Sequence, residues 1–374
     1  MVDLLSQHKK LEQQIFESIH RVIDSSAFIK GSEVAVFENT LADFLQVSHV
    51  ITCANGTDAL QIALMALELH PGDEVIVPAF TYVATAEVIA LLGLMPVMVD
   101  VDEDTFNISL SGLAKAITHR TKAIIPVHLF GQCSNMEPLM KLAEAHHLYV
   151  IEDNAQSLGA NYAFSNGHVK KAGTIGTIGC TSFFPTKNLG CLGDGGALMT
   201  NDPGLAEKIR MIANHGQRKK YYHEVVGCNS RLDTLQAAIL NVKLPHLEEY
   251  LNARRKAGDY YQIALKHFNY GILPASLPAT EPTYNQFTLK IRGGLRDKMK
   301  EYLEQKGIPS MIYYPLPLYK QKAFNKFVPT GFSLPVTEKL CESVLSLPIH
   351  TEMAEDELSY ICEIVLDFKE VGAI

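Results

Sequence analysis

The sequence has no apolar run long enough to cross a membrane. Its longest apolar stretch, Val88 to Val99, is interrupted by Gly93 and Pro96, whereas a spanning helix needs roughly 20 apolar residues. The first ten residues mix charges with leucines and lack the apolar segment and cleavage site of a secretory signal. We therefore expect a cytoplasmic protein without a transmembrane segment.

A surplus of positive charge and a paired cysteine motif are also missing. Lysine and arginine number 33 against 41 aspartate and glutamate residues, a net charge of -8, so no overall basic field attracts nucleic acid or a membrane surface. None of the seven cysteines forms a C-x-x-C pair, which argues against a zinc knuckle or a disulfide framework. We expect reduced, mostly buried thiols, no metal site, and phosphate bound only by local features.

The residues that are present fit a globular protein with a large core, since 47% are hydrophobic and 20% charged. Over the first 200 residues, short apolar runs alternate with segments of helical spacing. Apolar runs without strict alternation, joined by helices, indicate an α/β fold with a mostly parallel sheet covered on both faces. Strands are predicted at 49–53, 74–78, 96–101, 123–128, 148–152, 180–184 and 196–200, and helices at 11–23, 32–44, 58–69, 84–92, 111–117 and 137–146.

The pattern changes after Asn201. We predict a long helical region through Arg255 that breaks or kinks near Pro245. Beyond it, strands are predicted at 287–291 and 311–314, and helices at 296–306 and from Glu355. The prediction is a large domain over residues 1–250 and a smaller C-terminal α+β domain over residues 251–374.

Ligands of open α/β sheets bind beyond the carboxyl ends of the strands, and four loops at such ends carry unusual residues. The first loop contains Asn55, Gly56 and Thr57, between a strand and a helix. Glycine permits a tight turn, and the helix N-terminus with the Thr57 hydroxyl can hold a phosphate. On this segment alone a simple N-cap is the favoured alternative. Neither the dinucleotide pattern G-x-G-x-x-G nor the P-loop pattern is present.

Two further loops offer an aromatic platform and a carboxylate. In the second loop Phe80 and Tyr82 follow a strand, and an exposed ring there can stack on a flat heterocycle, although core packing explains Phe80 at least as well. The third loop has Glu152 and Asp153 at the end of an apolar strand, with Gln156 beyond. A buried carboxylate is costly unless it meets a cation such as a protonated pyridine nitrogen. A helix cap formed by Asp153 or Asn154 is the competing interpretation.

The fourth loop places Lys187 in a glycine-rich turn after an apolar strand, away from the solvated surfaces where lysine usually lies. If burial and neighbouring groups lower its pKa, its amine can attack a carbonyl. For Gly195 and Gly196, a hairpin into the next strand is a sufficient explanation. Together the four loops offer an amine, an acceptor for a pyridinium, an aromatic platform and donors for one phosphate. Pyridoxal 5'-phosphate (PLP) requires this set.

The sequence resembles the DegT/DnrJ/EryC1/StrS family of PLP-dependent sugar aminotransferases, within the aspartate aminotransferase (fold type I) superfamily. The resemblance covers nearly the whole chain and implies a large domain with a mostly parallel sheet between helices and a smaller C-terminal domain. Several independent motifs in the same order make it specific. These motifs lie at 54–60, 80–85, 152–156, 181–187, 193–197 and 227–238.

The resemblance also implies roles for individual residues. Lys187 forms the Schiff base with PLP and moves the proton during transamination, and Asp153 pairs with the pyridine nitrogen. Gln156 donates to the ring hydroxyl, and Tyr82 stacks on the ring. The implied phosphate-binding residues are Gly56, Thr57, Ser182 and, from the partner subunit of an obligatory homodimer, Asn229.

Within the family, the segments around Cys53, Phe80 and Cys180 look most like those of enzymes that aminate C3 of UDP-linked 3-keto-N-acetylglucosamine uronates. The implied reaction moves an amino group from L-glutamate to UDP-2-acetamido-2-deoxy-3-oxo-glucuronate, for cell-surface polysaccharide such as lipopolysaccharide O-antigen. Similar enzymes act on dTDP-linked 3-keto-6-deoxy sugars or on 4-keto sugars.

Three residues are predicted to contact the sugar nucleotide. Arg231 suits a sugar carboxylate or a diphosphate because its guanidinium fork matches either anion, and an interface ion pair explains it equally well. Tyr313 and Tyr314 belong to a segment that lines the sugar site in relatives. Tyr313 departs from the histidine that relatives commonly carry at this position.

Other functions fit the sequence less well. Dehydratases of this family carry histidine in place of the lysine, so Lys187 favours transamination. A desulfurase-like lyase needs a mobile cysteine, and none of the seven is clearly placed so. A non-catalytic PLP-binding regulator typically carries a DNA-binding domain, for which the N-terminal stretch is too short and insufficiently basic.

Overall fold

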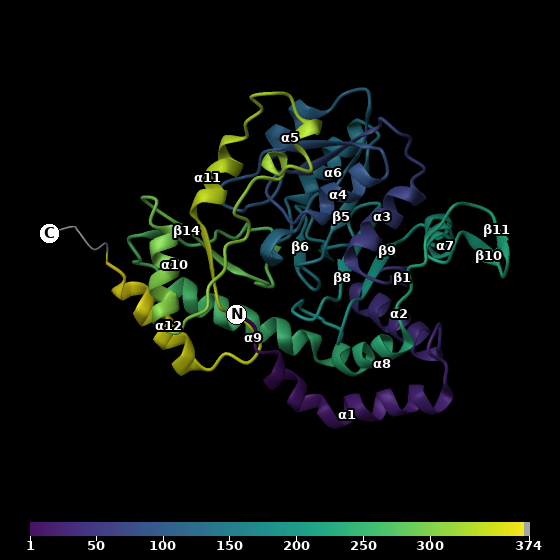
Figure 1. Cartoon of the computed structure of the whole chain (residues 1–374), viewed down its shortest axis with the longest axis horizontal. Helices are drawn as coiled ribbons and strands as arrows, with labels where there is room; N and C mark the ends of the chain where they lie inside the picture. Colours follow the sequence, from purple (N-terminus) through teal and green to yellow (C-terminus); the bar gives the residue numbers. More distant parts are fainter. Residues whose placement is uncertain (370–374) are drawn as a thin grey trace.

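The computed structural model describes residues 1–369 and is built on a seven-stranded sheet of order β1-β9-β8-β5-β4-β2-β3 (Figure 1). Within this sheet only β9 runs opposite to its neighbours. The predicted mostly parallel sheet is confirmed, and each of the seven predicted strands overlaps an observed one. The strands are β1 (His49–Cys53), β2 (Glu74–Pro78), β3 (Met95–Val99), β4 (Thr121–Ile124), β5 (Tyr149–Asp153), β8 (Ile178–Ser182) and β9 (Gly196–Thr200).

Helices cover both faces of the sheet. Successive residues of a strand point to opposite faces, and apolar residues on both faces are buried under these helices. In β2, Val75 and Val77 join one apolar cluster while Ile76 joins another. The first cluster includes helices α3 (Gly56–Ala66), α4 (Ala84–Leu91) and α7 (Pro203–Ile212), and the second includes α5 (Leu110–Ala116) and α6 (Met136–Ala145). This arrangement leaves the carboxyl ends of the parallel strands free to form a site.

Helices α1 (Leu4–Ser25) and α2 (Ser32–Leu45) both pack against α8 (Thr234–Lys243), and α1 runs alongside it on the outside of the molecule (Figure 1). A short turn that contains Pro245 separates α8 from α9 (Leu247–Ala264). The predicted break near Pro245 is therefore confirmed.

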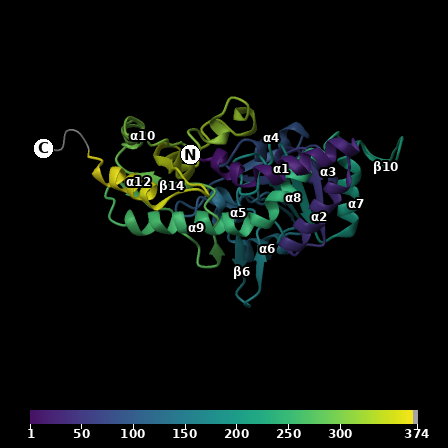
Figure 2. The same cartoon turned by 90° about the horizontal axis from the view of Figure 1, so that it is seen from below.

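The C-terminal part has its own apolar core around a three-stranded sheet of order β12-β14-β15. The boundary predicted at residue 250 falls inside α9, and the division into two domains stays a prediction. This part contains β12 (Gly271–Ile272), β14 (Phe287–Ile291), β15 (Val344–Leu347), α10 (Arg296–Gln305), α11 (Pro335–Ser343) and α12 (Glu355–Asp367). Another three-stranded sheet, with β13 (Thr280–Glu281), β6 (Asn161–Ala163) and β7 (Val169–Lys171), includes a hairpin that projects from one side (Figure 2).

The long helical region predicted after Asn201 is wrong between α7 and α8. There the chain forms a hairpin, β10 (Gln217–Lys219) and β11 (Tyr222–His223), and then an irregular segment. A Cβ at Gly216 would lie 1.7 Å from the Val225 carbonyl oxygen, so only glycine fits this crossing. The apolar spacing of the sequence gives no sign of this backbone contact.

The strand predicted at 311–314 is also wrong, since only Met311 forms a bridge, with Ser346. Pro315 and Pro317 follow closely and cannot donate to a ladder. The chain therefore leaves the sheet at this point.

The seven thiols are free; six are buried and Cys228 is half-buried, as predicted. No helix within residues 1–369 combines the length and apolarity that crossing a membrane requires. In the same residues no group of three or more histidine, cysteine, aspartate or glutamate side chains is arranged to hold a metal ion.

Candidate active site

The predicted site residues of the four loops lie at or just after the carboxyl ends of strands. Asp153 is the last residue of β5, and Ser182 is the last residue of the adjacent strand β8. Lys187 lies in the turn after β8, and Tyr82 lies between β2 and α4. Because these strands are parallel, their ends meet at one edge of the sheet.

The start of α3 approaches the end of β8 closely. A Cβ at Gly56 would lie 2.7 Å from the Ser182 Cβ, so a glycine is required at this point. Asn55 caps the helix, its Oδ1 accepting from the Asp58 amide at 2.8 Å, which confirms the N-cap interpretation. Within residues 1–369 the amides of Gly56 and Thr57, in the first turn of α3, have no protein acceptor. These amides and the Ser182 hydroxyl together suit an anion.

Asp153 is a buried carboxylate with only part of its hydrogen-bonding capacity used. The Thr85 hydroxyl donates to Oδ2 at 2.8 Å, and the Ala155 amide donates to Oδ1 at 3.2 Å. Burial raises the pKa of Asp153, while these donors and the positive charge of Lys187 act against the rise. The helix-cap interpretation of Asp153 is wrong, because a turn rather than a helix follows β5. A cationic partner would compensate this carboxylate.

Glu152 points to the other face of β5 and is fully engaged. Its Oε2 lies 2.8 Å from Nε2 of the buried His128, and it also accepts from the backbone amides of Gly173, Ile175 and Gly176. Burial alone would raise its pKa, but His128 and the amides outweigh burial and lower the pKa below its ordinary value of 4.5. Glu152 therefore fixes the end of β5 rather than offering a free carboxylate.

Lys187 is half-buried, and burial lowers its pKa to about 8, while the negative charge of Asp153 acts in the opposite direction. The turn that carries it is tightly held. The Lys187 amide donates to the Phe184 carbonyl at 2.9 Å. The Asn188 side chain donates to the Leu158 carbonyl and the Thr283 hydroxyl. An amine with this pKa is partly neutral near physiological pH, as a nucleophile requires.

Aromatic rings flank the edge where Asp153 lies. Tyr82 is 57% exposed, and its ring centroid lies 6.3 Å from that of Tyr314. Phe80 is buried against Phe106 and Phe130, which confirms the core interpretation of Phe80 and leaves Tyr82 as the available ring.

Gln156 connects this edge to the C-terminal part of the chain. Its Oε1 accepts from the Phe130 amide at 2.7 Å, and its Nε2 donates to the Tyr314 hydroxyl at 3.2 Å. Burial raises the phenol pKa of both Tyr314 and Tyr313. The structure thus brings one predicted sugar-site residue, Tyr314, beside Asp153 and Tyr82, and Tyr313 packs against Tyr314.

Asn229 and Arg231 are not brought to this group. Within residues 1–369 no hydrogen bond or ion pair joins either side chain to Lys187 or Asp153. Asn229 is exposed, and the half-buried Arg231 lines a cavity of about 230 Å³ that also contains Lys30. Their predicted roles at a shared site stay predictions.

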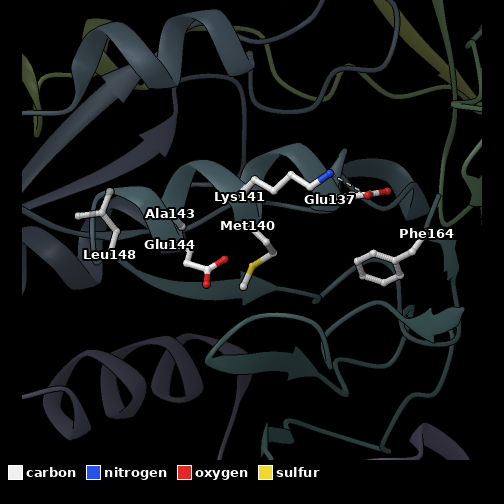
Figure 3. A pocket seen from close by; sticks show the side chains of 7 residues that line it. All are labelled: Glu137, Met140, Lys141, Ala143, Glu144, Leu148 and Phe164. Atoms are coloured by element: carbon white, nitrogen blue, oxygen red, sulfur yellow. Dashed lines mark hydrogen bonds and ion pairs between the residues drawn. The ribbon is translucent and has the colours of Figure 1, made fainter. Parts of the chain in front are cut away.

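A second cavity, of about 380 Å³, lies away from the strand ends (Figure 3). In it Lys141 reaches toward Glu137 along α6, and their ion pair measures 3.0 Å. None of the predicted site residues lines it. Its lining residues are Glu137, Met140, Lys141, Ala143, Glu144, Leu148 and Phe164.

Two contributing residues were not singled out from the sequence. Thr85 lies inside the motif at 80–85, but its contact with Asp153, 68 positions away, is not visible in the sequence. His128 ends a predicted strand, so the rule that ligands gather at strand ends offered a signal for it.

We predict that Thr85→Val weakens cofactor binding roughly 10- to 100-fold, because a buried hydrogen bond to a charged group is lost. The pKa of Asp153, already above its ordinary value of 3.8, should rise further. The ionised carboxylate is present above this pKa and is lost as the pH falls through it, so binding by the variant should fail at a higher pH than binding by the native protein. Cofactor titrations across pH measure this.

Thr85→Ser is the matched control, because it keeps the hydroxyl and should retain near-native binding. If Thr85→Val titrates like the native protein, Thr85 does not support the charge on Asp153.

A second prediction concerns the glycine at the start of α3. In Gly56→Ala the new Cβ would press against Ser182, so we expect a loss of roughly 1–3 kcal/mol in the free energy of unfolding and weaker cofactor binding. Gly112→Ala is the control, since its Cβ would meet Ser109 at an ordinary 3.5 Å. Thermal unfolding and cofactor titration compare the two; native behaviour of Gly56→Ala would show that the close approach is unimportant.

Comparisons with known proteins identify the chain. Residues 9–366 match the DegT/DnrJ/EryC1/StrS aminotransferase family. The chain is 45% identical to a UDP-2-acetamido-2-deoxy-3-oxo-D-glucuronate aminotransferase of Pseudomonas aeruginosa, covering 96% of this chain and 98% of that protein. It is also 45% identical to a pleiotropic regulatory protein of Geobacillus stearothermophilus, covering 98% of both chains.

Solved structures agree with these relatives. DesV of S. venezuelae, in complex with a ketimine intermediate, has a TM-score of 0.93 at 38% identity and covers 98% of this chain and 96% of its own. NtdA of Bacillus subtilis, with bound cofactor PMP, has a TM-score of 0.87 at 32% identity and covers 95% of this chain and 81% of its own. The chain therefore belongs to the DegT/DnrJ/EryC1/StrS family and is a PLP-dependent nucleotide-sugar aminotransferase with the fold of type I aminotransferases.

Proposed function

We propose that this enzyme transfers the amino group of L-glutamate to C3 of UDP-2-acetamido-2-deoxy-3-oxo-glucuronate, in the synthesis of a cell-surface polysaccharide. The observation that carries this substrate is the 45% identity to the P. aeruginosa aminotransferase named for it, over nearly the full length of both chains. The reaction itself rests on Lys187 and Asp153, which lie close enough to shift each other's pKa.

The donor set at the strand ends fits PLP. Asp153 offers a buried carboxylate to a protonated pyridine nitrogen, and the exposed Tyr82 offers a ring face. The start of α3, with Gly56 and Thr57, lies against Ser182 and offers donors to a phosphate. Gln156 has a second Nε2 hydrogen besides the one given to Tyr314. When bound here, PLP withdraws electrons from the carbon that loses its proton.

In this proposal Lys187 is the general base and acid. Its Nζ, with a pKa lowered to about 8, takes a proton from Cα of glutamate and returns a proton at the sugar carbon that receives the amino group. Asp153 keeps the opposing pyridine nitrogen protonated by its negative charge, and Thr85 supports that charge.

We further propose a homodimer with shared sites. Apolar side chains of α1, of α2 and of the segment between them are exposed, which is typical of a protein interface; they are Leu5, Phe16, Ile23, Phe28, Ile29 and Val36. Asn229 and Arg231 lie two positions apart in the segment before α8. If this segment reaches the site of the partner subunit, it carries both residues there. Asn229 would then contact the phosphate of PLP, and Arg231 an anionic group of the sugar nucleotide near Tyr313 and Tyr314.

Replacing Lys187 with alanine tests the assigned base. Lys187→Ala should lose the visible imine absorbance of the cofactor-bound protein and its turnover, because the strand-end site then has no amine. Lys170→Ala, at an exposed position of β7, is the control and should behave like the native protein. A Lys187→Ala variant that still transaminates would refute the role.

The substrate is tested with a panel of acceptors after the glutamate half-reaction. We expect kcat/KM for the UDP-linked 3-keto uronate to exceed that for the same sugar without the C6 carboxylate by at least roughly 10-fold, the value of one charge-assisted hydrogen bond. In Arg231→Met this preference should disappear. Preference for a dTDP-linked 3-keto-6-deoxy sugar or a 4-keto sugar would contradict the proposal, and a weakened dimer with unchanged preference would assign Arg231 to an interface ion pair.

A further inference from the structure

Lys243, in the last turn of α8, is a buried lysine that the proposed reaction does not use. Its side chain is 1% exposed, and burial lowers its pKa to about 8. Within residues 1–369 no carboxylate forms an ion pair with it. A buried charge without a carboxylate contributes little to stability and often costs it. A lysine at this position therefore depends on the hydrogen bond that its amine makes.

The contact that Lys243 does make is with the turn that carries Lys187. Its Nζ donates to the Gly190 carbonyl at 2.6 Å, a buried hydrogen bond between residues 53 positions apart. Gly190 itself has no room for a side chain, since a Cβ there would lie 2.4 Å from the Pro185 carbonyl oxygen. The next residue, Cys191, donates its amide to the Phe183 carbonyl at 2.7 Å. The hydrogen bond from Lys243 thus fixes a backbone that is already closely packed.

Helix α8 holds the same turn at a second point. The Leu192 amide donates to Oε1 of Gln236 at 2.9 Å, and Nε2 of Gln236 donates back to the Leu192 carbonyl at 3.3 Å. Gln236 and Lys243 lie near opposite ends of α8, so both ends of the helix contact the turn, at Leu192 and at Gly190. The segment with Asn229 and Arg231 leads directly into α8.

From these contacts we infer that Lys243 is a positioning residue, which through the Gly190 carbonyl sets the place of the Lys187 amine at the strand ends. This inference rests on the proposed role of Lys187. Gln236 acts in the same way through Leu192. A displacement of about 1 Å in a catalytic group can cost as much as roughly 100-fold in rate, so a turn carrying the catalytic amine benefits from two fixed points.

Lys243→Met tests the inference, because methionine retains much of the side-chain volume and removes the donor. In the protein without cofactor, we expect hydrogen exchange of the Lys187 and Cys191 amides to accelerate roughly 10-fold, as for loss of one buried hydrogen bond. In the holoenzyme we expect kcat to fall roughly 10- to 100-fold with unchanged KM for both substrates. The exchange measurement does not depend on Lys187 being the base, so its result is separable from failure of the proposed function.

The matched control is Lys290→Met. Lys290 is also buried and donates to a backbone carbonyl, that of Glu103 at 2.9 Å; it also pairs with Asp104 at 2.8 Å and lies in β14, outside the turn. The Lys290→Met variant should leave both the hydrogen exchange of the turn and kcat unchanged. If Lys243→Met does not fold, Gln236→Leu takes its place, with faster exchange at Leu192 as the expected result. Native exchange and native kcat in the folded variant would overturn the inference.

Discussion

A carboxylate buried at the end of the central strand β5 is the constraint around which the site is arranged. Removing the charge of Asp153 from water is costly, and within residues 1–369 its hydrogen-bond donors are the Thr85 hydroxyl and the Ala155 amide. The remaining hydrogen-bonding capacity of the Asp153 carboxylate faces the edge where Lys187 and Tyr82 lie. In the proposed site the pyridine nitrogen of PLP would compensate this charge, so that the cost of burial would become selectivity for the cofactor.

The neighbouring residues keep that carboxylate in place. Glu152, on the opposite face of the same strand, is held by His128 and three backbone amides. Glycine makes the close approaches around the site possible, as at Gly56 beside Ser182 and at Gly196, whose Cβ would lie 2.5 Å from the Asn55 carbonyl oxygen. The edge is therefore assembled by backbone contacts as much as by side chains.

The sequence predicted the parallel sheet and the positions of Lys187 and Asp153, because strand patterns are local and strand ends are where such folds bind ligands. It did not predict the irregular chain between α7 and α8, where Gly216 and Val225 meet, nor the departure of the chain from the sheet after Met311. The roles of Thr85 and Lys243 could not be predicted either, and both for one physical reason. Their contacts lie 68 and 53 positions away, and no local pattern encodes them.

Reaction and substrate depend on different parts of the molecule. The Lys187 amine and the Asp153 carboxylate lie in one chain at the strand ends, whereas Asn229 and Arg231 lie outside that group and would reach a site only in the proposed dimer. The most direct test of the central claim is borohydride reduction of the PLP-bound protein, followed by peptide mass spectrometry. The account predicts that the reduced cofactor is attached to the peptide containing Lys187; attachment to Lys243 or another lysine, or no attachment, would contradict it.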